Sequence, residues 1–123
     1  MIINGKIITK AFIVAQPWVD KFFSENPDEV KTWEMRSTGT KIRGEVGIIE
    51  KGTGLIVGTT TIVDSLEQLT ISELIATMHK HRVDYKNNPH LIKWNKPWVL
   101  KDSKRIEPVP YTHPQGAVIW VNV

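Results

Sequence analysis

Hydrophobic residues recur along most of this chain either in alternation with polar ones or in short apolar runs, and both patterns are typical of β-strands. Strands are predicted over residues 6–14, 32–36, 44–50, 55–64, 98–100, 106–111 and 117–123. Residues 51–54 predict a hairpin connection between two of these strands, and residues 101–105 read as a charged turn. Pro108 and Pro110 predict an edge strand or an extended arm, because proline cannot donate a ladder hydrogen bond.

Two segments instead carry the spacing of a helix. Pro17 can begin the first helix, since its missing N–H costs nothing in the first turn, and residues 18–23 supply an apolar stripe. The second helix is predicted over residues 70–78, where Thr70 and Glu73 match a capping box. Strands interspersed with two helices predict an α+β domain.

The composition fits one domain over residues 1–123, with 41% hydrophobic residues and no cysteine. Disulfides, thiolate nucleophiles and cysteine-ligated zinc are therefore excluded. His79 and His81 do not share a helix face, so we expect no metal, and no motif indicates a cofactor. No apolar run approaches the roughly 18 residues of a membrane span, and the first residues lack the order of a signal peptide. We therefore expect a cytoplasmic protein that does not contact membranes.

Positive charge is concentrated in one part of the sequence. The whole chain carries +3, whereas residues 78–105 hold eight lysines and arginines and only two aspartates. Such an excess favours a polyanionic partner, although it also occurs on surfaces that only keep a protein soluble. Residues 83–96 are loop-like and interleave Tyr85 and Trp94 with basic side chains. These two rings are candidates for stacking on bases, and the alternative is that they pin the loop to the sheet.

The most informative stretch is residues 31–36, Lys-Thr-Trp-Glu-Met-Arg, in which three charges lie among residues that suit a strand. In a strand, Glu34 and Arg36 share one face, and the apolar positions face the other way. Lys31 falls in the turn before the strand, from where its long side chain can bend toward Glu34. Lysine and arginine donate to phosphate or carbonyl oxygens, and a carboxylate accepts from base N–H groups. The alternative is a solvated strand face with a weak Glu–Arg pair.

Lys31-x-x-Glu34-x-Arg36 resembles the G-x-K-x-x-E-x-R signature of the ASCH domain family, whose members are small β-barrels similar to the PUA domains of RNA-modifying proteins. Further short matches follow in the family's order at residues 16–18, 43–48, 55–58, 98–100, 108–111 and 116–120. The resemblance spans roughly residues 12–121. It departs at Glu29, where the motif has a glycine, so we expect the turn before Lys31 to differ.

The resemblance implies a PUA-like small β-barrel of about five to six mostly antiparallel strands with two or three helices. It also implies a ligand cleft around the motif. The expected ligand is RNA, another single-stranded nucleic acid or a nucleotide-like small molecule, and protein partners are left unknown by the sequence. The candidate binding residues are Lys31, Thr32, Glu34, Arg36, Trp18, Tyr85 and Trp94.

A hydrolase is the second function that the motif allows. A lysine held against Trp18 or Trp33 would have a lowered pKa and could act as a base, with Lys31 and Glu34 as the catalytic residues. Members of the family include nucleases as well as amidohydrolases that act on acylated cytidines. The hydrolase alternative therefore covers a ribonuclease or an amidohydrolase on a modified nucleoside.

The chain departs from the amidohydrolase pattern, which has a threonine three residues after the lysine and a glutamate downstream. Here the third residue is Glu34, and Thr32 is only one residue on. Glu67 and Glu73 are the nearest downstream candidates, and neither matches the position convincingly. A protein-interaction module, in which Glu34 and Arg36 are only structural, is the third alternative.

Overall fold

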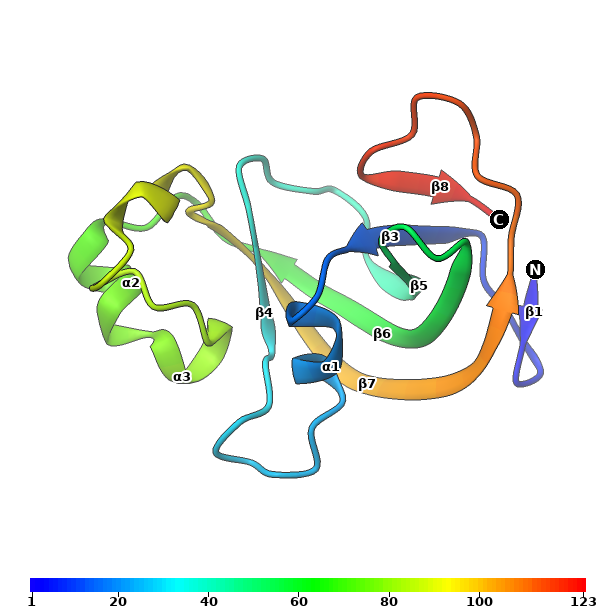
Figure 1. Cartoon of the computed structure of the whole chain (residues 1–123), viewed down its shortest axis with the longest axis horizontal. Helices are drawn as coiled ribbons and strands as arrows, with labels where there is room; N and C mark the ends of the chain where they lie inside the picture. Colours follow the sequence, from blue (N-terminus) through cyan, green and yellow to red (C-terminus); the bar gives the residue numbers. More distant parts are fainter.

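The computed structural model describes all 123 residues and is built on one six-stranded sheet. The strands are β3 (Lys10–Val14), β4 (Trp33–Arg36), β5 (Gly44–Glu50), β6 (Leu55–Ser65), β7 (Lys96–Pro110) and β8 (Trp120–Asn122), in the order β4-β7-β6-β5-β3-β8. Only β3 and β5 run parallel. The long strands β6 and β7 bend strongly, so that the sheet curls into a half-barrel (Figure 1). The predicted small, barrel-like α+β fold with mostly antiparallel strands is confirmed.

The helices are short and lie outside the sheet. They are α1 (Trp18–Phe22), α2 (Ile71–Ala76), α3 (Met78–His81) and a 3₁₀ helix (Pro89–Lys93). α1 lies beside β4, whereas α2 and α3 gather at the end of the sheet that is remote from both termini (Figure 1). The predicted capping box is present, since the Thr70 hydroxyl accepts from the Glu73 N–H and the Glu73 carboxylate accepts from the Thr70 N–H. No helix is long and apolar enough to span a bilayer.

Alternating side chains of the sheet build a hydrophobic cluster on each face. In β3, Phe12 and Val14 enter the cluster that contains Trp98, whereas Ala11 and Ile13 enter the opposite one. Fully burying one such large side chain stabilises the fold by about 1.5–3 kcal/mol. A smaller cluster beneath the helices includes Met35 of β4 and joins the helical end of the molecule to the strand that carries the motif.

The prediction of a single strand over residues 6–14 is wrong, because the chain forms two separate strands there. Strand β2 (Lys6–Ile7) pairs with β1 (Ile2–Ile3), and β3 begins only at Lys10. Asn4 and Gly5 both have positive φ, at 51° and 80°, which reverses the chain sharply enough for a hairpin. This hairpin forms a small second sheet outside the main one.

The predicted turn over residues 101–105 is also wrong, since β7 continues through it without a break. The ladder between β6 and β7 slips register at three points, and Asp102 adopts a positive φ of 54°. Such irregularities bend a strand without ending it. The edge position predicted for Pro108 and Pro110 is confirmed, because β4 pairs with β7 only as far as Val99.

Three further elements are shorter than predicted. The last strand covers only Trp120–Asn122, and the motif strand begins at Trp33 rather than at residue 32, with Lys31 before it as predicted. The helix predicted over residues 70–78 breaks at Thr77, whose hydroxyl donates to the Glu73 carbonyl 2.7 Å away before α3 begins. Residues 83–96, predicted as loop, contain the 3₁₀ helix.

Candidate ligand-binding pocket

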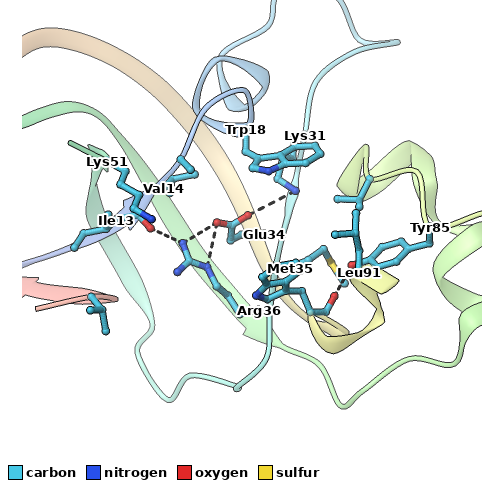
Figure 2. Close-up of a pocket in the computed structure, with 14 residues that line it drawn as sticks. Ile13, Val14, Trp18, Lys31, Glu34, Met35, Arg36, Lys51, Tyr85 and Leu91 are labelled. Atoms are coloured by element: carbon cyan, nitrogen blue, oxygen red, sulfur yellow. Dashed lines mark hydrogen bonds and ion pairs between the residues drawn. The ribbon is translucent and has the colours of Figure 1, made fainter. Parts of the chain in front are cut away.

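Glu34 and Arg36 lie on one face of strand β4, as the alternation predicted, and their side chains are hydrogen-bonded to each other. The Arg36 Nε and Nη2 atoms both donate to Glu34 Oε2, at 3.1 and 2.8 Å. Nη2 also donates to the Ile13 carbonyl at 2.6 Å, which ties β4 to β3 across the curl of the sheet (Figure 2). The guanidinium carbon lies 5.2 Å from the centre of the Trp98 ring, so the arginine rests on the aromatic core.

Lys31 bends toward Glu34 from the segment before β4, as predicted. Its Nζ atom donates to the His81 carbonyl at 2.8 Å and lies 3.6 Å from Glu34 Oε1. The hydrophobic wall against it is Trp18, whose ring centre is 5.1 Å away, together with Phe22 at 5.8 Å, and not Trp33. Burial in this position lowers the pKa of Lys31 to about 8, and the Glu34 carboxylate opposes the shift.

The motif face is buried. Only 1% of Lys31 and 5% of Glu34 remain exposed, although both carry charge. The alternative of a solvated strand face is therefore wrong. Charges are buried in a protein only when they are paired, and here two cations share one carboxylate.

A pocket of about 350 Å³ opens over this cluster. Lys31, Glu34 and Arg36 supply its charged side, beside Trp18 (Figure 2). Trp94 also belongs to its mostly hydrophobic walls. The volume lies at the lower end of the range that small-molecule sites occupy. A few polar groups converging in an apolar pocket are typical of a ligand site.

Two polar atoms of the cluster make no hydrogen bond within the protein, and one of them is held only by the ion pair with Lys31. Glu34 Oε1 accepts no hydrogen bond within the protein, and Arg36 Nη1 donates none. Every fully buried side-chain nitrogen or oxygen does have a hydrogen-bond partner, so neither of these two atoms is completely buried. The pocket therefore offers a carboxylate oxygen and a guanidinium N–H to whatever enters it.

The other predicted binding residues differ in position. Trp18 and Trp94 both line the pocket, and Trp94 is 39% exposed. Tyr85 also borders the pocket, but it is buried edge-on against His81, and its hydroxyl donates to the Trp94 carbonyl. This burial raises the pKa of Tyr85 well above its ordinary value. Tyr85 thus pins the loop, which is the alternative that the sequence left open.

Thr32, also a predicted binding residue, does not line the pocket, and its main chain is hydrogen-bonded to Lys80 and Leu100.

The basic segment does not gather at the pocket. None of its lysines or arginines lines the cavity, whereas Lys51, from the turn between β5 and β6, does. The sequence analysis treated residues 51–54 only as a hairpin turn and missed this contribution. Its only signal was a lysine in a tight turn, and the parallel pairing of β3 with β5 is what brings that turn to the pocket.

His81 is a structural residue. Its side chain is fully buried, Nε2 donates to the Leu74 carbonyl at 2.7 Å, and Nδ1 accepts from the Val83 N–H at 2.9 Å. Burial lowers the pKa of His81 to about 4, so the ring is neutral near pH 7. No group of three or more histidine, aspartate or glutamate side chains lies close enough to hold a metal ion.

Comparison with known proteins identifies the fold of this chain through a solved structure. No model of a known protein family matches the sequence, and no curated protein does. Among solved structures, the chain is similar to the crystal structure of a mutant ZmASCH protein from Zymomonas mobilis, with a TM-score of 0.64 and 12% identity. The similarity covers 93% of this chain and 87% of that one. At this identity it shows the fold alone, which is the fold that the ASCH resemblance predicted.

Proposed function

We propose that this chain is an ASCH-type domain that binds RNA or a nucleotide-like ligand, with a base held in the pocket beside Glu34. The observation that carries the proposal is the accessible pair of Glu34 Oε1 and Arg36 Nη1 at the charged side of a mostly hydrophobic pocket. A nucleobase is a flat ring with N–H donors and carbonyl acceptors on its edge, and these two atoms complement such an edge.

The walls and the charge of the pocket support the same ligand class. Trp18 and Trp94 offer aromatic surface for stacking, which contributes about 1–3 kcal/mol per base in single-strand binders. Three cations, Lys31, Arg36 and Lys51, line the pocket against the one carboxylate of Glu34. The pocket is therefore net positive and suits the phosphate that accompanies a base.

A hydrolase that uses Lys31 as its base is the second candidate, and the lowered pKa of Lys31, about 8, favours it. The same lysine already donates to the His81 carbonyl, and Glu34 is the only carboxylate in the pocket. Glu67, Glu73 and Thr32 all lie outside its lining, so the amidohydrolase arrangement has no counterpart here. Binding therefore requires fewer groups than catalysis does, and we rank it first.

The test is to incubate the protein with single-stranded RNA, single-stranded DNA, nucleoside monophosphates and acylated nucleosides. Binding is read by fluorescence titration and product by chromatography. Lys51→Ala should weaken binding, whereas Lys86→Ala should not, because both lysines are exposed and only Lys51 lines the pocket. Affinity should also fall severalfold from about 50 to about 200 mM salt if roughly two phosphates are contacted.

The outcomes separate the alternatives. Binding without product, weakened by Lys51→Ala and by salt, supports the proposal. Product that disappears in Lys31→Met, while the fold survives, makes the pocket an active site and inverts the ranking. If no probe binds and none is converted, the proposal fails and the protein-interaction module becomes the better interpretation.

A further inference from the structure

A second hollow of about 450 Å³ adjoins the pocket. The two cavities share three lining residues, Ile13, Lys51 and Val118, so they meet along a common border. Lys51 forms no ion pair and no side-chain hydrogen bond within the protein. A free ammonium group therefore stands where one hollow passes into the other.

Tyr111 and His113 form the far side of this second hollow. The Tyr111 hydroxyl lies 2.9 Å from His113 Nδ1, and His113 Nε2 lies 3.0 Å from the Ala117 carbonyl. Because a carbonyl only accepts, His113 Nε2 donates to it, and Nδ1 is hydrogen-bonded to the tyrosine hydroxyl. Both ring nitrogens are thus held, and an exposed imidazole is fixed in one orientation.

The turn between β5 and β6 keeps this hollow open. Gly52 and Gly54 line it with positive φ, at 83° and 71°, so a residue with a side chain would be strained at either position. Neither glycine has another group within 4 Å of where a Cβ would stand. The turn therefore contributes main chain and open space to the second hollow.

We propose that the second hollow is a subsite for the nucleotide adjacent to the one in the pocket, so that the ligand is a single-stranded nucleic acid and not a free nucleotide. The inference rests on the proposed function. The neighbouring base stacks on the fixed His113 ring, as bases do on histidine and other aromatic side chains in single-strand recognition. Lys51, at the border, contacts the phosphate that joins the two nucleotides.

The experiment compares ligands that differ only in length. The protein is titrated with the ribonucleoside 5′-monophosphates and with the matching homotrinucleotides, and DNA trinucleotides show whether the sugar is read. His113→Ala should weaken trinucleotide binding at least about fivefold and leave monophosphate binding unchanged. His90→Ala is the matched control, because His90 is exposed and lines neither hollow. Tyr111→Phe, which keeps the packing and removes only the hydroxyl that orients His113, should give a smaller loss of the same kind.

Equal affinity for monophosphates and trinucleotides would overturn the subsite and leave the proposed function standing. The same holds if His113→Ala weakens both ligands by the same factor or neither of them. If no monophosphate and no trinucleotide binds, the proposed function fails and the subsite fails with it.

Discussion

Arg36 donates twice to a single oxygen of Glu34, the residue two positions before it on the same strand. The double bond to Oε2 leaves Oε1 turned toward Lys31, 3.6 Å away, and accessible from the pocket. One carboxylate thus balances two cations and still retains an acceptor. The same three side chains therefore form a buried ion-paired cluster and line the pocket.

Glu34→Gln should destabilise the protein strongly, because Lys31 and Arg36 would lose the charge that pairs them. Lys31 is almost fully buried, and an uncompensated buried charge costs about 3–5 kcal/mol. We expect the midpoint of urea unfolding to fall with little change in its slope.

The matched control is Glu45→Gln, since Glu45 pairs at 3.5 Å with the exposed Lys6. Such a surface pair contributes about 0–1 kcal/mol. A similar loss of unfolding free energy in Glu34→Gln and Glu45→Gln would contradict the structural importance of the buried cluster.

Ligand affinity should fall as the pH rises through about 8. Burial gives Lys31 a pKa of about 8, so the lysine loses its charge there. An anionic ligand then meets less positive charge in the pocket. The measurement is affinity for a nucleotide at pH 7 and pH 9, in the wild type and in Lys31→Met, in which the dependence should be absent. A turnover rate that instead rises through pH 8 would favour Lys31 as a catalytic base.

The free energy of unfolding should decrease as the pH falls from about 6.5 to about 4. His81 has a folded pKa of about 4 against an ordinary value of 6.5, so in this window the unfolded chain binds the extra proton. The full shift corresponds to roughly 3 kcal/mol. Urea unfolding at pH 7 and pH 4.5 measures it. His81→Gln should flatten the dependence, whereas the exposed His79→Gln should keep it; equal slopes in all three proteins would show that His81 does not carry the effect.

Gly58→Ala should destabilise the protein by about 1–3 kcal/mol through overpacking. A Cβ at this position would lie 2.2 Å from Cζ of Phe23 and 2.7 Å from the Lys104 carbonyl oxygen. Phe23 follows α1, which begins at the pocket residue Trp18, so ligand affinity should fall as well. The measurement is a double-mutant cycle in urea with Phe23→Leu, in which the second substitution should relieve part of the cost. If the free-energy changes of the two substitutions were strictly additive, a contact between residue 58 and Phe23 would be contradicted.

Local patterns predicted those parts of the fold that depend on neighbours in the sequence. The hairpin at residues 51–54 and the capping box of Thr70 and Glu73 each lie within a few residues, and both are present. The sequence predicted a turn over residues 101–105 because these residues are polar and because nothing in the local sequence indicates the strand with which they pair. Pairing with β6 keeps it extended, and the register slips that permit this arise from tertiary packing.

The candidate site likewise has a part that the local sequence predicted and a part that it did not. Alternation predicted that Glu34 and Arg36 share a face, and the turn before β4 predicted the direction of Lys31. The carbonyls that complete the cluster come from Ile13 and His81, which are 23 residues from Arg36 and 50 residues from Lys31 in the chain. Only the topology of the sheet brings them together, so no local pattern could have indicated them.

The most direct test of the proposal that the pocket binds a nucleotide is to follow the tryptophan indole N–H signals by two-dimensional nitrogen–proton NMR while a single-stranded RNA trinucleotide is added. Trp18 and Trp94 line the pocket and Trp33 does not, so the protein carries its own internal control. We expect saturable shifts of the Trp18 and Trp94 signals with one common dissociation constant, and little change at Trp33. No saturable shift, or the largest shift at Trp33, would contradict binding in this pocket.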